Sequence, residues 1–261
     1  MKAKKSMLLY RMYRMVLGFL RLVYPKTGVS GLENLPDEPA LFVGNHAQMH
    51  GPIVCELYFP VERYTWCAGE MMHLKEVPAY AYRDFWSGKP GYIRWFFKLA
   101  SYAIAPLCVL LFNNANTIGV YHDARVLSTF RSSVEKLQEG KGVVVFPEQA
   151  KPYNNILCDF QDGFLDVARI YYRKTGRVLP IVPIYIAPDL KKLYLCRPTY
   201  FRPEAPIAEE KQRICSYLMD EISEFARSLP RHTVVPYMNV AKKYYPCNIP
   251  DEVNTNEKTG R

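Results

Sequence analysis

Hydrophobic positions follow two patterns that alternate along the chain from residue 40 onward. Short runs of continuous apolar residues predict buried strands at residues 40–45, 62–68, 117–121, 142–148, 179–187 and 192–201. Between them, apolar residues recur at helical spacing and predict helices at residues 51–59, 124–140, 161–176 and 205–230. Continuous apolar strands that alternate with helices are typical of a parallel sheet buried on both faces. We therefore predict an α/β fold with a mostly parallel sheet and helices on both faces.

The N-terminal segment, residues 6–25, has apolar residues at helical spacing but is interrupted by Arg11, Arg14 and Arg21. These arginines argue against a signal peptide and against a membrane-spanning helix. An amphipathic helix that lies in the membrane interface fits better. A helix that packs on the core of its own domain is the open alternative.

A second apolar segment, residues 91–114, carries no charge from Leu99 to Phe112. Pro106 should kink any helix there. The residues at one end resemble interfacial anchors: Tyr92, Arg94, Trp95 and Lys98. We predict a hairpin-like or re-entrant element that dips into one leaflet, with a buried core helix as the alternative.

These patterns divide the chain into three parts. Residues 1–28 are predicted to be an amphipathic, membrane-associating helix. Residues 29–240 are predicted to form the α/β domain, with the membrane-dipping segment 91–114 inside it. Residues 241–261 are polar, and we expect a flexible, frayed tail.

Composition narrows the partners of this 261-residue chain. The formal net charge is +9, and aromatic residues make up 14%. Such a chain could bind nucleic acid or an anionic membrane. Because the basic residues flank apolar segments and no nucleic-acid-binding signature is present, we expect an anionic membrane surface and no nucleic acid. The seven cysteines form no C-x-x-C pair, which favours a reducing compartment.

Two predicted strands end in chemically active residues. Residues 41–44 run into Asn45 and His46, and residues 142–146 run into Pro147 and Glu148. Ligands bind at the carboxyl ends of parallel strands, so both stretches should open onto one crevice. His46 could act as a general base, or Asn45 or His46 could cap the following helix.

A metal site is the third possibility for this stretch. His46 and His50 are four positions apart and would share one face of a helix. The residue after His46 is Ala47, however, where the H-E-x-x-H motif of metalloproteases has its glutamate. No third ligand is close in sequence, and we expect no metal.

Four short blocks resemble those of the glycerophospholipid acyltransferase family. "NHAQMHGP" is similar to the family's N-H-x4-D block, "GVYHDAR" to its second block, "FPEQAK" to its F-P-E-G-[ST]-R block and "LPIVPIYIA" to its V-P-I-V-P-V strand. "FQDGFLDVA" is similar to a helix start that the family often has between the third and fourth blocks. The blocks occur in the family's order and cover residues 29 to 190 approximately.

The resemblance implies acyl transfer from a thioester, acyl-CoA or acyl-carrier protein, to the hydroxyl of a lysophospholipid. The expected acceptor is 1-acylglycerol-3-phosphate, which would give phosphatidic acid without any cofactor beyond the acyl donor. His46 matches the family's general base. The expected substrate-binding residues are Asn45, Glu148, Gln149, Lys151 and either His122 or Arg125. The protein is expected at the cytoplasmic face of a membrane.

The chain departs from the family where the catalytic histidine needs an acid. The family aspartate stands five residues after the histidine, and that position here is Gly51. A one-residue deletion would bring His50 to this place, where its neutral ring could accept an N–H from His46. Glu148 or Glu70 could supply the missing charge. A catalytically decayed lipid-binding protein and a metal-dependent hydrolase that uses His46 and His50 remain the alternatives.

Overall fold

The computed structural model describes residues 2–249, including the side chains of residues 7–150 and 154–249. Its centre is an 8-stranded sheet with the order β1-β9-β8-β2-β5-β3-β4, to which β10 adds beside β8. The central strands are parallel: β8 (Pro180–Ala187), β2 (Leu41–Gly44), β5 (Gly142–Val145), β3 (Arg63–Ala68) and β4 (Thr117–Val120). Three strands run in the opposite direction: β1 (Gly28–Ser30), β9 (Lys192–Leu195) and β10 (Thr199–Tyr200). The fold is therefore α/β with a mostly parallel sheet, as the sequence predicts.

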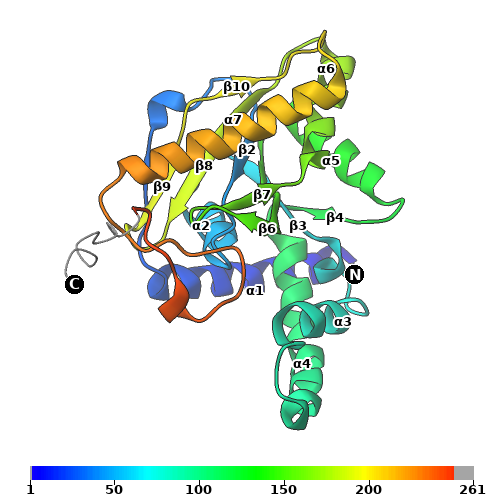
Figure 1. Ribbon diagram of the computed structural model, residues 1–261. Coiled ribbons are helices and arrows are strands. Elements are labelled where there is room, and N and C mark those ends of the chain that lie inside the picture. Colours follow the sequence, from blue (N-terminus) through cyan, green and yellow to red (C-terminus); the bar gives the residue numbers. More distant parts are fainter. Residues whose placement is uncertain (1, 250–261) are drawn as a thin grey trace, which may run out of the picture.

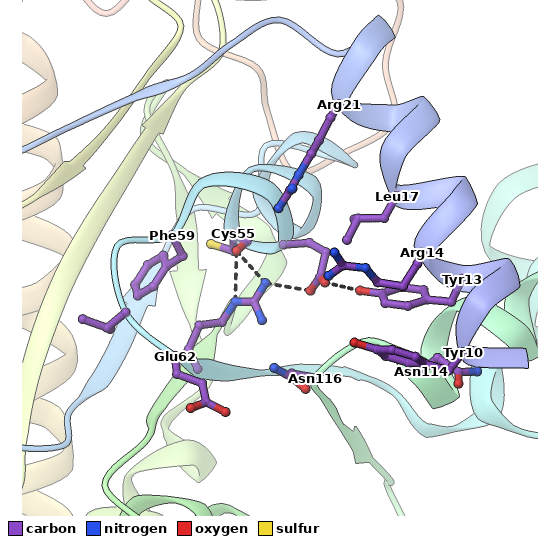
Figure 2. Close-up of a pocket in the computed structure, with 13 residues that line it drawn as sticks. Tyr10, Tyr13, Arg14, Leu17, Arg21, Cys55, Phe59, Glu62, Asn114 and Asn116 are labelled. Carbon is purple, nitrogen blue, oxygen red and sulfur yellow. Dashed lines mark hydrogen bonds and ion pairs between the residues drawn. The ribbon is translucent and has the colours of Figure 1, made fainter. Parts of the chain in front are cut away.

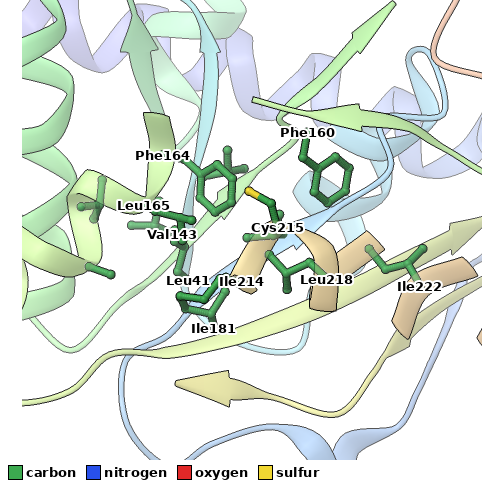
Figure 3. Close-up of a cluster of buried hydrophobic side chains, with 14 of the residues drawn as sticks. Leu41, Val143, Phe160, Phe164, Leu165, Ile181, Ile214, Cys215, Leu218 and Ile222 are labelled. Carbon is green, nitrogen blue, oxygen red and sulfur yellow. The ribbon is translucent and has the colours of Figure 1, made fainter. Parts of the chain in front are cut away.

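Helices cover both faces of this sheet because successive strand side chains point to opposite sides. Leu41 and Val43 face a cluster formed with α5 (Val126–Gln138), α6 (Asp166–Thr175) and α7 (Ile207–Ser228). Figure 3 shows part of this cluster, in which Ile214 and Leu218 of α7 approach the strands. Phe42 faces the other side, where α2 (His50–Tyr58) contributes Val54 and Cys55. Every residue of β2 is buried, which explains why its apolar run is continuous.

Local differences from the prediction lie at the edges of elements. The predicted strand 192–201 is broken into β9 and β10, and the predicted helix 161–176 starts with the 3₁₀ turn Asp162–Leu165. The short strand β1 and the hairpin of β6 (Glu148–Tyr153) and β7 (Cys158–Phe160) are additional elements. Gly140 and Gly176 follow α5 and α6 with φ values of 85° and 69°, which explains why glycine ends these helices.

The N-terminal helix α1 (Lys2–Val23) has one side packed on the domain and one apolar side that is exposed. Tyr13 and Leu17 are buried against Leu57 of α2. The opposite side keeps large apolar side chains in solvent: Leu8, Met15, Phe19, Leu22 and Val23. The helix therefore packs on the domain and still presents an apolar surface.

Polar contacts fasten α1 to the amino-terminal edge of the sheet. The Tyr13 hydroxyl donates to the Glu56 carboxylate, which also pairs with Arg63 at 2.6 Å. Figure 2 shows this chain of contacts beside a cavity of about 260 Å³, into which Arg14 and Arg21 of α1 also turn. The cavity lies where β3 and β4 begin, at the edge of the sheet opposite the ends of β2 and β5.

The apolar segment 91–114 consists of a 3₁₀ turn, Gly91–Ile93, followed by one continuous helix, α4 (Arg94–Asn114), so the expected hairpin is wrong. Pro106 lies inside the helix, where it removes one backbone hydrogen bond without ending the element. Ala105 packs against Val77 and Ala81 of α3 (Val77–Ala81). Figure 1 shows α4 projecting away from the sheet. Within the described residues, the stretch 91–114 is the one helix that is long and apolar enough to cross a membrane by length and composition.

The segment after residue 240 is attached to the domain, in contrast to the expected frayed tail. Residues Lys242–Tyr244 form a 3₁₀ turn, and Thr233 pairs with Cys247 in an antiparallel bridge. Asn248 is 1% exposed, and its side-chain amide donates to the Ala226 carbonyl at 2.8 Å. The remainder of the predicted tail, residues 250–261, lies outside the described residues.

Candidate active site

The ends of β2 and β5 bring His46 and Glu148 together, as the order of the strands requires. β2 pairs with β5 in parallel, so both strands end at the same edge of the sheet. The His46 backbone N–H donates to Glu148 Oε2 at 2.5 Å, although the residues are 102 positions apart. The two stretches therefore meet at one edge of the sheet, as the sequence predicts.

Glu148 holds the backbone around the site. Its side chain is 5% exposed, and its second oxygen, Oε1, accepts the Cys158 N–H at 2.9 Å. The carboxylate thus joins the loop after β2 to the β6–β7 hairpin. Burial raises its pKa to about 7, although the hydrogen bonds from Cys158 and His46 lower it. Glu148 contacts the backbone of His46 and not its ring, so it is not the acid that orients the imidazole.

The raised pKa of Glu148 predicts a pH effect on stability. The folded protein binds this proton more tightly than the unfolded chain, so the free energy of unfolding falls as pH rises from about 4.5 to about 7. In Glu148→Gln this contribution is absent. We therefore expect the difference in unfolding free energy between variant and parent to move in favour of the variant across that range, as measured by denaturant titrations.

Glu139 provides the control for this measurement. It is exposed, and its hydrogen bond with Lys136 lowers the pKa of its carboxyl. The trend for Glu139→Gln should therefore be absent or weakly opposite. A Glu148→Gln curve parallel to that of the parent between pH 4.5 and 7 would contradict the assignment.

The His46 imidazole is held by one backbone atom and two aromatic rings. Its Nδ1 bonds to the carbonyl oxygen of Gln48. The ring meets Phe146 edge to face at a centroid distance of 5.2 Å and Tyr237 at 5.8 Å. A carbonyl can only accept, so Nδ1 carries the proton and Nε2 is left as the basic nitrogen. Burial lowers the pKa of His46 below its ordinary value of 6.5, which keeps the ring neutral at pH 7.

Asn45 has a different role from the one that the sequence suggests. It is 2% exposed, and both atoms of its amide bond to the backbone of Ile186 in β8, at 3.0 and 2.8 Å. These bonds continue the β2–β8 pairing by one residue. Asn45 therefore fixes the end of β2 through its amide, both atoms of which are already bonded to the backbone of β8.

His50 does not meet His46 as the shifted alignment requires. It is the first residue of α2, and its Nδ1 lies 2.7 Å from the Tyr24 hydroxyl. Burial and the positive charge of Lys242 lower the pKa of His50. Within the described side chains, no hydrogen bond joins the two histidines. The proposed replacement of the missing acid by His50 is therefore wrong.

The other expected binding residues lie on strand β6 and on the loop after β4. Gln149 follows Glu148 in β6 and donates to Asp159 at 2.9 Å. Lys151 lies in the same strand, and its side chain is outside the described part of the structure. His122 and Arg125 follow β4 at the sheet edge, and both are exposed.

The two candidates on the β4 loop differ in their contacts. Arg125 pairs with Asp123 at 2.9 Å and with Glu76 at 3.4 Å, and it stacks on Tyr121 at 4.1 Å. Two carboxylates therefore already compete for its guanidinium. His122 is the more accessible of the two for a ligand.

Metal binding has little support from the residues near His46. Among the side chains of residues 7–150 and 154–249, no group of three or more His, Cys, Asp or Glu is placed to hold a metal ion. His50 is turned toward Tyr24, and the Nδ1 of His46 is occupied by Gln48. The metal-hydrolase alternative therefore has no third ligand in this region.

Sequence reasoning missed the residues that surround His46. Gln48 lies inside the first block, but it contacts His46 through its backbone carbonyl. Every residue has such a carbonyl, so the residue type does not indicate this role. Tyr237 packs on the His46 ring and Tyr245 bonds to Gln48, and both come from a distant part of the chain and from none of the four blocks. With 20 tyrosines in the chain, neither spacing nor composition singles them out.

Comparisons with known proteins give a similarity to solved structures. No protein-family model and no curated protein matches the chain. Among solved structures, it is similar to the 1-acyl-sn-glycerophosphate (LPA) acyltransferase PlsC from Thermotoga maritima, at a TM-score of 0.45 and 17% sequence identity. The similarity covers 83% of this chain and 76% of that chain.

Proposed function

We propose that the protein is an acyltransferase that moves a fatty acyl group from a thioester to the hydroxyl of a lysophospholipid. The observation that carries the proposal is the state of His46. Its Nδ1 is bonded to a carbonyl and its pKa is lowered, so Nε2 is a neutral base at the carboxyl edge of a parallel sheet. The ordered sequence blocks supply the reaction class.

The chemistry needs no covalent enzyme intermediate. His46 Nε2 takes the proton from the acceptor hydroxyl as its oxygen attacks the thioester carbonyl carbon. The carbon–sulfur bond then breaks, and the proton passes to the departing thiolate. The products are the ester and a free thiol, either of coenzyme A or of acyl-carrier protein.

The acceptor that we propose is 1-acylglycerol-3-phosphate, which gives phosphatidic acid. Lys151 and Gln149 would contact the phosphate from β6, and His122 would contact it from the loop after β4. Support comes from their places in the chain, because β6 follows the carboxyl end of β5 and the loop with His122 follows that of β4. Glu148 is not among the proposed phosphate contacts, because both of its oxygens accept backbone N–H groups.

Acyl release from a thioester by the purified protein in detergent tests the reaction class. We expect release from acyl-CoA or acyl-carrier protein to depend on added lysophosphatidic acid. Other lysophospholipids in parallel reactions define the headgroup. If neither donor releases acyl groups with any acceptor, the proposal fails and the lipid-binding alternative is favoured, with the aspartate missing at Gly51 as its reason.

We propose further that the protein works on the cytoplasmic face of an anionic membrane. α1 and α4 expose large apolar side chains, among them Phe19, Leu22, Trp95, Leu99 and Tyr102. The net charge of +9 would strengthen binding to anionic lipids. Both helices would deliver the active site to the surface where lysophospholipids reside.

Leu99→Glu tests α4 as a membrane-docking helix. Leu99 is 63% exposed, and burying a leucine in lipid contributes about 1.5–3 kcal/mol. We therefore expect about 10- to 100-fold weaker binding to vesicles that contain phosphatidylglycerol, measured by co-sedimentation. Leu127 of α5 is 67% exposed, so Leu127→Glu is a matched control that should bind as the parent does. Equal binding by both variants and the parent would remove α4 from the docking surface.

A further inference from the structure

The position of the family's aspartate cannot hold a side chain in this protein. A Cβ atom on Gly51 would lie 2.5 Å from the His46 carbonyl oxygen and 3.1 Å from the Phe146 ring. The Gly51 N–H also donates to that same carbonyl at 3.0 Å. The backbone from 46 to 51 is therefore closed into a tight turn, and its geometry differs from one that presents an acid at position 51.

The closed turn places a different acceptor against the imidazole. Ala47 and Gln48 have φ values of 45° and 54°, in the left-handed region that residues with a Cβ rarely adopt. This conformation aims the Gln48 carbonyl at His46 Nδ1. A strained backbone persists only when its surroundings hold it, so the contacts of Gln48 explain its persistence.

The segment 237–245 supplies those contacts. The Gln48 side-chain amide donates from Nε2 to the Met238 carbonyl at 3.1 Å. The Tyr245 hydroxyl donates to Gln48 Oε1 at 3.1 Å. Tyr237, from the same segment, packs edge to face on the His46 ring. Both the nitrogen and the oxygen of the Gln48 side-chain amide are thus hydrogen-bonded. These two bonds also hold the backbone of Gln48 in place.

We infer that Gln48 is the positioning residue of His46. Its backbone carbonyl orients the imidazole in place of the aspartate of the H-x4-D block, and its side chain is held by Met238 and Tyr245. The carbonyl accepts the Nδ1 proton and so keeps Nε2 basic. His50 and Glu148 are both bonded to other groups and are not available for this role. Tyr237, Met238 and Tyr245 therefore belong to the active site. The catalytic part of this inference rests on the proposed function, whereas the tautomer of His46 does not.

Histidine ¹⁵N NMR of the full chain, without substrate, tests the tautomer. The chain has five histidines, and the His46 signals are assigned by their loss in His46→Ala. We expect a neutral ring that is protonated at Nδ1 at pH 7. Tyr245→Phe and Gln48→Ala should raise the population protonated at Nε2. A parent ring protonated at Nε2, or a tautomer ratio unchanged in both variants, overturns the inference.

Kinetics then test the consequence for turnover. Removing one hydrogen bond to Gln48 should lower kcat about 5- to 10-fold in Tyr245→Phe, with KM for both substrates unchanged. Tyr244 is a neighbouring tyrosine, 67% exposed, so Tyr244→Phe is the matched control and should retain full activity. Equal kcat in the two tyrosine variants contradicts the catalytic role. Without turnover in the parent, the proposed function fails, and the NMR result alone decides on the tautomer.

Discussion

Replacing His46 by alanine is expected to lower the rate of acyl transfer by about 10²–10⁴-fold, the usual contribution of a general base. The ring lies at the carboxyl edge of β2 with its Nδ1 occupied by Gln48. Its loss removes the neutral Nε2 that the proposed reaction uses as its base. The rate of thioester cleavage with lysophosphatidic acid present measures the effect, and circular dichroism checks that the fold is retained.

The pH dependence of the parent adds a second readout for His46. A general base works only when deprotonated, so the rate should fall as pH drops through the pKa of His46. Because burial lowers that pKa, the acid limb of kcat/KM should lie below pH 6.5. His73 is exposed and bonds to Tyr121, so His73→Ala serves as the control and should keep the parent's rate. A fully active His46→Ala variant would exclude His46 as the base.

Introducing an aspartate by Gly51→Asp, where the similar acyltransferase block has one, is expected to destroy activity instead of improving it. The new Cβ would meet the His46 carbonyl oxygen at 2.5 Å, and backbone atoms cannot move aside as a flexible side chain can. The turn that carries His46 must open, and a displacement of about 1 Å can cost about 10²-fold in rate. Overpacking of this kind also lowers the free energy of unfolding by about 1–3 kcal/mol.

Two alanine variants separate crowding from charge at this position. Gly51→Ala adds the same Cβ without a carboxylate, so it should lose activity and stability to a similar extent. A Cβ atom on Gly88 would meet no other atom within 4 Å, so Gly88→Ala should leave both unchanged. Activity equal to or above that of the parent in Gly51→Asp would show that the turn can accommodate the acid, and would remove the geometric reason for its absence.

The sequence alone determined the mostly parallel sheet and the convergence of the ends of β2 and β5, which carry His46 and Glu148. The buried strands β2, β5 and β8 have nearly continuous apolar sequences because both of their faces are covered, and this pattern is visible without coordinates. The convergence of His46 and Glu148 followed from one rule, that parallel strands end at the same edge. Pro106 was misleading, because one missing hydrogen bond does not end a helix of 21 residues.

Only the tertiary structure decided what orients His46. The acceptor is a backbone carbonyl, which every residue has, and its direction depends on two left-handed residues that the sequence does not mark. The contact from Tyr245 to Gln48 joins residues 197 positions apart, in a segment whose polar composition predicted a frayed tail. Local patterns report burial and periodicity, whereas a hydrogen bond between distant segments depends on how the whole chain packs. The sequence could therefore identify the candidate base, but the folded chain was needed to identify the group that holds it.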